Sequence, residues 1–306
     1  MAKPVSAPKS KSSPSKGAAA RSAGGRPAGL FTWIAVGLVV VVVAVIVIVK
    51  VSNGSASNAN SSAWTATSPT LAAEVTNISP SVFNAVGVVA HQAVTAPQPL
   101  AKQPELTAKL PNGTTVPEVL YIGAEYCPYC AAQRWATIAA LSRFGTWKGL
   151  GNTTSSSTDV YKSTPTFTFA KATFTSKYLV FKGVETLTNN YKTLMTPTKA
   201  EQAILVKYDT PKYVVGMNPN DAGAIPFMSM GNKFLVSGAS FNPGLLTGLT
   251  RDQIAANLSA TSSPITQAIV TSANDQTAAI CTLTKQQPAS VCMSAGVKAA
   301  KKLMKL

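Results

Sequence analysis

Residues 119–130 read Val-Leu-Tyr-Ile-Gly-Ala-Glu-Tyr-Cys-Pro-Tyr-Cys. The apolar run at 119–123 predicts a buried strand, and apolar residues at helical spacing after it predict a helix over 128–144. The two cysteines, Cys127 and Cys130, would therefore lie where the strand passes into the helix. A Cys-x-x-Cys pair in this setting is typical of a reactive dithiol.

The spacing assigns different roles to the residues of this motif. Cys127 would cap the helix, where unpaired backbone N–H groups and the helix dipole favour a thiolate. Pro128 would occupy the first helical position, where its missing N–H costs nothing. Cys130 would lie one turn deeper and act as the resolving thiol. Cys127 is therefore predicted to be the nucleophile, because the thiolate is the reactive form.

Four other interpretations compete with a reactive dithiol. The pair could form half of a structural zinc site with Cys281 and Cys292, although that second pair is wider than the two to four residues typical of zinc ligands. A c-type haem is excluded, because Ala131 stands where the haem motif needs histidine. A structural disulfide between Cys127 and Cys130, with no redox role, is also compatible with the sequence. A cysteine hydrolase would have to rest on His91, the single histidine.

The N-terminal region predicts a membrane anchor. Residues 1–29 contain six basic residues, no acid and much Ser, Ala, Pro and Gly, which predicts a disordered basic cytoplasmic tail. Residues 30–49 are twenty uncharged residues, long enough for a transmembrane helix from Leu30 to Val49. A cleaved signal peptide, whose apolar core is shorter, and a buried helix are the alternatives. The positive-inside rule places residues 51–306 outside the cytoplasm.

The net charge of the chain is +16, and four C-terminal lysines contribute to it: Lys298, Lys301, Lys302 and Lys305. A basic surface near a bilayer could contact anionic lipid, but a solvated helix face is the favoured interpretation. The sequence shows no nucleic-acid-binding motif, and no cofactor or metal is predicted.

The remaining chain divides into a linker, a main domain and a C-terminal segment. Residues 50–67 predict a flexible linker and residues 68–262 a domain. The domain is expected to contain the elements that follow: helical turns over 68–90, strands at 166–175 and 177–184, a helix from Thr196-Pro197 to Lys207, a hairpin over 225–237, and a helix opened by a Thr250/Gln253 capping box. Residues 263–306 predict a helical hairpin, which a Cys281–Cys292 disulfide would staple. A second redox pair is the alternative there.

Ile225-Pro226 precedes the predicted hairpin, and we expect this peptide bond to be cis, although cis is the minor form of X-Pro bonds. A cis-proline loop at this place in chain order would face the dithiol.

The motifs resemble those of a membrane-anchored prokaryotic family of unknown function within the thioredoxin superfamily. The resemblance rests on the stretches Tyr121–Trp135, Ala140–Gly145, Thr164–Phe167, Ser176–Tyr178 and Ile225–Phe227, and on Ile280-Cys281 with Pro288 and Val291-Cys292. It implies an α/β, thioredoxin-like fold, with an insertion at about 146–222 and a C-terminal helical hairpin, preceded by one transmembrane helix. It implies no substrate.

The chain departs from thioredoxin itself at one buried position. Tyr121 stands where thioredoxin has a buried aspartate that assists the resolving thiol, which puts a thioredoxin-like reductase rate in doubt; Glu125 need not face the sulfurs. Arg134 and Arg143 are expected to be solvated or capping residues, and Trp135 to lie in the core.

Three hypotheses about function follow. The first is a membrane-anchored extracytoplasmic thiol–disulfide oxidoreductase, in which Cys127 and Cys130 react and Pro226 shapes the site. Pro128, Tyr129 and Ile225 would contact the substrate, with backbone beside Pro226 pairing to it as an added strand. The partners would be envelope proteins with thiols or disulfides and a membrane or secreted redox partner. The second is a binding or assembly module with purely structural disulfides; a redox sensor is a third possibility.

Overall fold

The computed structural model describes residues 64–88 and 94–306. The predicted basic tail, the predicted anchor Leu30–Val49, nearly all of the linker and His91 lie outside these residues. Within the described residues, no helix combines the length and the apolarity needed to cross a bilayer.

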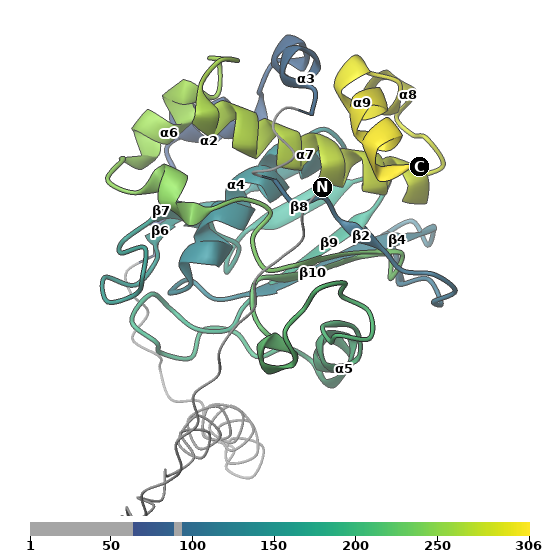
Figure 1. Ribbon diagram of the computed structural model, residues 1–306, viewed down its shortest axis with the longest axis horizontal. Coiled ribbons are helices and arrows are strands. Elements are labelled where there is room, and N and C mark those ends of the chain that lie inside the picture. The colour runs from purple at the N-terminus through teal and green to yellow at the C-terminus, as the bar shows by residue number, and fades with distance from the viewer. Residues whose placement is uncertain (1–63, 89–93) are drawn as a thin grey trace, which may run out of the picture. The chain divides into compact units, whose positions relative to one another are not determined.

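A mixed sheet forms the centre of the structure (Figure 1). Its middle strand is β4 (Thr115–Gly123), the strand that the sequence predicted to lead into the cysteine motif. β10 (Phe227–Met230) pairs with β4 antiparallel and β11 (Phe234–Ser237) continues the hairpin. On the other edge of β4, β9 (Val180–Glu185) runs parallel to it. The order across the sheet is thus β9-β4-β10-β11, and the short β2 (Gln98–Pro99) extends it beyond β11.

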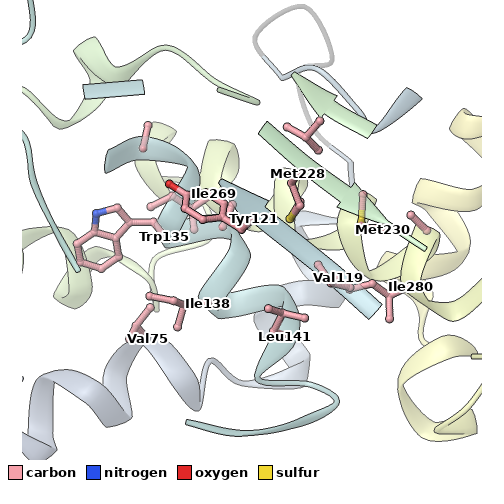
Figure 2. Packing of buried hydrophobic residues seen from close by; sticks show 14 of the residues in the cluster. Val75, Val119, Tyr121, Trp135, Ile138, Leu141, Met228, Met230, Ile269 and Ile280 are labelled. Carbon is pink, nitrogen blue, oxygen red and sulfur yellow. The ribbon is translucent and has the colours of Figure 1, made fainter. Parts of the chain in front are cut away.

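Alternating residues of β4 build two cores, one on each face of the sheet. Val119 and Tyr121 pack against α4 (Pro128–Leu141) and α7 (Pro264–Leu283), as Figure 2 shows. Leu120 and Ile122 pack on the opposite face in a cluster that includes residues of α5 (Lys199–Tyr208). Figure 1 shows α7 and α5 on opposite sides of the sheet. The period-two pattern of a strand buried on both faces therefore produces three layers, helix on sheet on helix.

The other elements surround these layers. They are α2 (Pro69–Thr76), α3 (Pro80–Val86), α6 (Arg251–Asn257), α8 (Ala289–Cys292) and α9 (Ala295–Met304), the strands β1 (Thr65–Ala66), β3 (Thr107–Lys109), β5 (Gly145–Lys148), β6 (Gly151–Thr154), β7 (Pro165–Thr168) and β8 (Thr173–Ser176), and two short 3₁₀ turns at Pro219–Asp221 and Pro243–Leu246. β1, β6 and β7 form one small sheet, and β5 and β8 form another.

Side-chain caps fix where two of the helices begin. The capping box predicted for Thr250 and Gln253 is present at the start of α6. α5 begins at Lys199, two residues later than the sequence predicted. Thr198 caps it, and Glu201 returns a bond to the Thr198 N–H. A reciprocal cap satisfies two otherwise unpaired backbone donors and so outweighs the Thr-Pro signal just upstream.

The strand predicted over 166–175 is wrong as a single element. It divides into β7 and β8 at a turn in which the N–H of Ala172 donates to the carbonyl of Phe169 at 3.0 Å. The two strands then pair with different partners, β6 and β5. An alternating pattern identifies strand residues but does not reveal a turn between two strands of the same pattern.

The segment expected as an insertion, about 146–222, contributes two elements to the central layers. β9 pairs with β4 through Val180–Glu185, and α5 covers one face of the same sheet. Both elements therefore belong to the central layers. The strands β5 to β8, between α4 and β9, pair in two separate small sheets.

The C-terminal segment forms the helical arrangement that the sequence predicted. α7 ends at Leu283, and α8 and α9 follow after a turn. A disulfide joins Cys281 on α7 to Cys292 on α8, with a Cα–Cα distance of 5.5 Å. This confirms the predicted pairing.

Candidate active site

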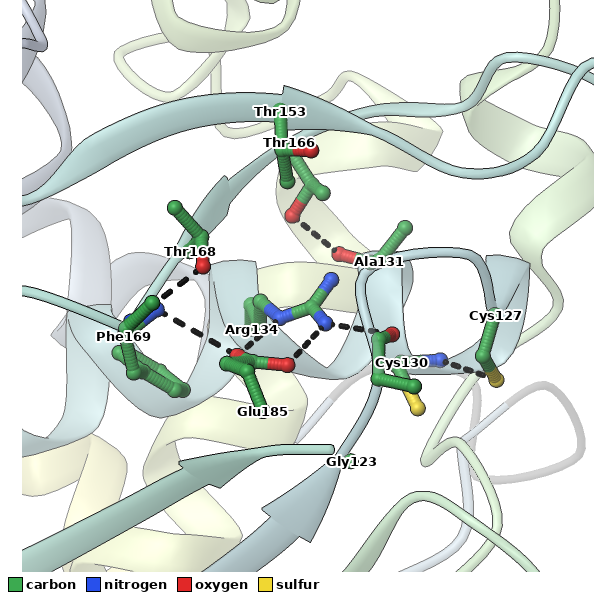
Figure 3. A network of polar contacts seen from close by, with 12 residues as sticks. Gly123, Cys127, Cys130, Ala131, Arg134, Thr153, Thr166, Thr168, Phe169 and Glu185 are labelled. Carbon is green, nitrogen blue, oxygen red and sulfur yellow. Dashed lines mark hydrogen bonds and ion pairs between the residues drawn. The ribbon is translucent and has the colours of Figure 1, made fainter. Parts of the chain in front are cut away.

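The Cys-Pro-Tyr-Cys motif occupies the first turn of α4, directly after β4. Cys127 is the N-cap residue, and its Sγ accepts a hydrogen bond from the N–H of Cys130 at 3.2 Å (Figure 3). Pro128 stands in the first turn, where a helix needs no N–H donor. The capping role predicted for Cys127 is confirmed.

The chain before β10 closes over the Cys127 sulfur. The Ile225–Pro226 peptide bond is cis, as the sequence predicted. The Cys127 thiol donates to the carbonyl of Ile225 at an S···O distance of 3.6 Å. Because β10 pairs with β4, these residues, 98 apart in the sequence, meet at one end of the sheet.

The two cysteines have opposite electrostatic environments. The hydrogen bond from the Cys130 thiol is the largest of several effects that lower the pKa of Cys127; backbone N–H groups and the Arg134 charge add to it, and burial opposes it. Burial raises the pKa of Cys130 well above its ordinary value, and the Cys127 thiolate adds to that shift. Cys127 is therefore the thiol that ionises first and Cys130 the one that keeps its proton.

A buried ion pair lies behind the dithiol. Arg134, on α4, donates from Nε and Nη2 to the two carboxylate oxygens of Glu185 at 2.8 and 2.6 Å, and from Nη2 to the carbonyl of Ala124 at 2.7 Å (Figure 3). Both side chains are completely buried. The expectation of a solvated or capping Arg134 is thus wrong. The parallel pairing of β9 with β4 places the carboxylate of Glu185 within hydrogen-bonding distance of Arg134 on α4. Burial raises the pKa of Glu185, and the Arg134 guanidinium opposes that shift.

Arg143 is also not a solvated residue. Its guanidinium donates to Asn274 Oδ1 at 2.9 Å and to the Ser294 hydroxyl at 3.0 Å, and it lies 4.2 Å from the centre of the Phe83 ring. It therefore ties the end of α4 to α7 and to the start of α9. Trp135 is fully buried, as predicted.

Tyr121 fills the space beneath the motif. Its ring packs edge-on against Phe169 at 5.1 Å, and burial raises the pKa of its hydroxyl well above the ordinary value. A Cβ at Gly123 would approach the Tyr121 hydroxyl to 2.3 Å. A side chain at position 123 would therefore collide with the buried ring of Tyr121, which explains the glycine there.

Tyrosine rings border the motif. Tyr129, 42% exposed, meets Tyr161 edge-on at 5.9 Å, and Tyr126 packs against Tyr191 at 4.6 Å. Of the three residues predicted to contact substrate, Tyr129 is exposed, Ile225 is half-buried and Pro128 is buried.

Glu185, Tyr161 and Tyr191 escaped prediction from the sequence. A signal existed for Glu185, an acid that directly follows the strand predicted over 177–184. The loops that carry Tyr161 and Tyr191 show no sequence signal that identifies them.

Among the described residues, no three His, Cys, Asp or Glu side chains cluster to hold a metal. Cys281 and Cys292 are bonded to each other and are not free to complete a zinc site with the dithiol.

The fold and the site define a mixed α/β protein with a Cys-x-x-Cys pair at the junction of its central strand and a core helix. The chain belongs to the family described as a domain of unknown function (DUF929), whose model matches residues 109–282. No curated protein and no solved structure matches the chain.

Proposed function

We propose that this protein is a thioredoxin-fold thiol–disulfide oxidoreductase, anchored in the cell membrane by Leu30–Val49 with its domain on the extracytoplasmic side. The strand order β9-β4-β10-β11, with helices on both faces and the dithiol after β4, supports the thioredoxin-like assignment. The single observation that carries the activity is the asymmetry of the two thiols. Cys127, with a lowered pKa, caps the helix beside cis-Pro226, and Cys130 is buried with a raised pKa.

In the reducing direction, the Cys127 thiolate attacks one sulfur of a substrate disulfide. A mixed disulfide forms, and the other substrate sulfur leaves as a thiolate. Cys130 then loses its proton and attacks the Cys127 sulfur. The Cys127–Cys130 disulfide forms and the second substrate thiolate leaves, so the substrate gains two electrons. Oxidation of a substrate dithiol is the same sequence in reverse, and a membrane or secreted partner resets the pair.

A substrate polypeptide would lie across the loop of Ile225 and Pro226 as an added strand. Tyr129 and Tyr161 would supply the apolar contact on one side, and Tyr191 on another. Aromatic side chains with a polar end suit surfaces that bind changing partners.

The proposal is tested by trapping in cells that make the full-length chain. Cys130→Ser removes the thiol that would release a mixed disulfide at Cys127. This variant should therefore accumulate mixed disulfides with envelope proteins, seen on a gel as bands that disappear on reduction. Cys127→Ser is the matched control and should give none. The absence of any Cys127-dependent band would refute the proposed oxidoreductase activity.

A binding or assembly module is the second candidate, and one observation favours it: Cys127 is only 5% exposed and Cys130 is fully buried. A structural pair should stay oxidised below about −300 mV, whereas a working oxidoreductase should titrate reversibly between about −270 and −120 mV. A redox titration of the full-length chain, read by alkylation and mass spectrometry, separates the two.

A further inference from the structure

A polar cavity of about 250 Å³ opens beside the dithiol helix. Glu125, two residues before Cys127, lines it together with Thr153 of β6, Asn189 and Arg251. The strand β6, which lines the cavity, pairs with β7, and β7 is hydrogen-bonded to the first turn of α4. The Thr166 hydroxyl donates to the carbonyl of Ala131 at 2.8 Å (Figure 3).

Glu125 supplies a negative charge to the wall of this cavity. The residue is only 5% exposed, yet its carboxylate makes no hydrogen bond or ion pair with any group in the described part of the chain. Its backbone N–H is used, donating to the carbonyl of Leu187 at 2.8 Å, so the residue is held firmly in place. A carboxylate that faces the cavity without a protein partner can accept a charge-assisted hydrogen bond from a cationic ligand group.

Arg251 provides the opposite charge on the same cavity. Its Nε and Nη2 donate to the carbonyls of Thr166 and Thr153 at 2.8 and 2.6 Å. These bonds fix the guanidinium and leave Nη1 for another acceptor. Glu125 and Arg251 do not pair with each other, since Arg134–Glu185 is the one ion pair within 4.0 Å in residues 64–88 and 94–306.

Two opposite charges that face one cavity and do not meet are complementary to a ligand that carries both. We propose that this cavity binds the α-amino-acid zwitterion of a small ligand, with its ammonium on Glu125 and its carboxylate on Arg251. The binding stands on the cavity alone. Its use, to select amino-acid thiols or disulfides for the adjacent Cys127, rests on the proposed oxidoreductase function.

The binding test uses a matched series without sulfur, by calorimetric titration of the full-length chain. L-Serine carries both charges, ethanolamine lacks the carboxylate, and 3-hydroxypropionate lacks the ammonium. L-Serine should bind at least about tenfold more tightly than either, because each single-charge probe loses one charge-assisted contact. Equal affinities for the three probes, or no binding of any, overturn the proposal.

Glu125→Gln should lower the affinity for L-serine by about tenfold and leave that for 3-hydroxypropionate unchanged. Glu125 has no protein partner to lose, so the variant should fold. Glu105→Gln, a change at an exposed glutamate, is the matched control and should behave as wild type. An unchanged L-serine affinity in Glu125→Gln refutes the assignment.

A parallel thiol series tests the function separately. L-Cysteine, cysteamine and 3-mercaptopropionate carry the same three charge patterns. L-Cysteine should reduce the Cys127–Cys130 disulfide fastest, and Glu125→Gln should remove that advantage. If no thiol reduces the disulfide while L-serine still binds, the proposed oxidoreductase function is refuted and the proposed zwitterion site is supported.

Discussion

The buried pair of Arg134 and Glu185 gives the sharpest test of how this site is built. Glu185→Ala removes the two guanidinium bonds of 2.8 and 2.6 Å and leaves Arg134 completely buried, with the Ala124 carbonyl as its remaining bonded partner. An uncompensated buried charge costs about 3–5 kcal/mol. We therefore expect the free energy of unfolding to fall by that amount in a urea titration followed by circular dichroism.

A double substitution separates stability from reactivity. Arg134→Met combined with Glu185→Leu replaces the pair by apolar groups of similar size and should restore most of the lost stability, because well-packed apolar replacements of buried pairs are often neutral or stabilising. The pKa of Cys127 should nevertheless rise, since the positive charge of Arg134 is one of the groups that lower it. The pH dependence of iodoacetamide alkylation of Cys127 measures this shift.

Two results would refute the reasoning. A loss below about 1 kcal/mol in Glu185→Ala would mean that the pair behaves as a solvated surface contact. An unchanged alkylation profile in the folded double variant would mean that Arg134 does not act on Cys127. Glu105→Ala, at an exposed position, controls for the loss of one negative charge.

The remaining predictions concern the thiols, one buried acid and the disulfide. In the reduced protein, Cys127 should alkylate from a lower pH than Cys130, because their pKa values are shifted in opposite directions; equal profiles by mass spectrometry would contradict this. Burial raises the pKa of Asp275 to about 7, and within the described residues neither carboxylate oxygen has a hydrogen-bond partner. The folded pKa lies above the unfolded one, so the folded state holds the proton more tightly and its stability falls as pH rises from about 4 to 7. The loss is on the order of 4 kcal/mol, and Asp275→Asn should flatten that dependence in urea titrations. Replacing both Cys281 and Cys292 by serine opens a loop with a sequence separation of 11 and should cost about 3 kcal/mol, with alkylation of Cys127 unchanged; a change in that alkylation would link the disulfide to the dithiol.

Where a feature depends on neighbouring residues, the sequence predicted it well. The apolar run at 119–123 lies within β4, and the capping box at Thr250 starts α6. Cys127 caps α4 with Pro128 in the first turn. Each of these depends on backbone preferences and on hydrogen bonds within about four residues.

Predictions failed where a residue's surroundings come from elsewhere in the chain. A solvated Arg134 was a fair expectation from its own segment, because arginine is rarely buried without a partner. The partner stands 51 residues away on a strand whose parallel pairing the sequence pattern did not reveal. The same pairing places β9, which falls within the segment expected as an insertion, inside the central sheet.

The sequence by itself determined the local parts of this protein: a strand, a capped helix and two cysteines one turn apart. These follow from side-chain period, proline geometry and capping. The tertiary structure alone decided what surrounds the cysteines: the carbonyl of Ile225 against Cys127, the Arg134–Glu185 pair behind the helix, and the cavity between Glu125 and Arg251. The reason is that strand order and register bring distant segments together, and a pattern with period two identifies a strand without specifying its neighbour.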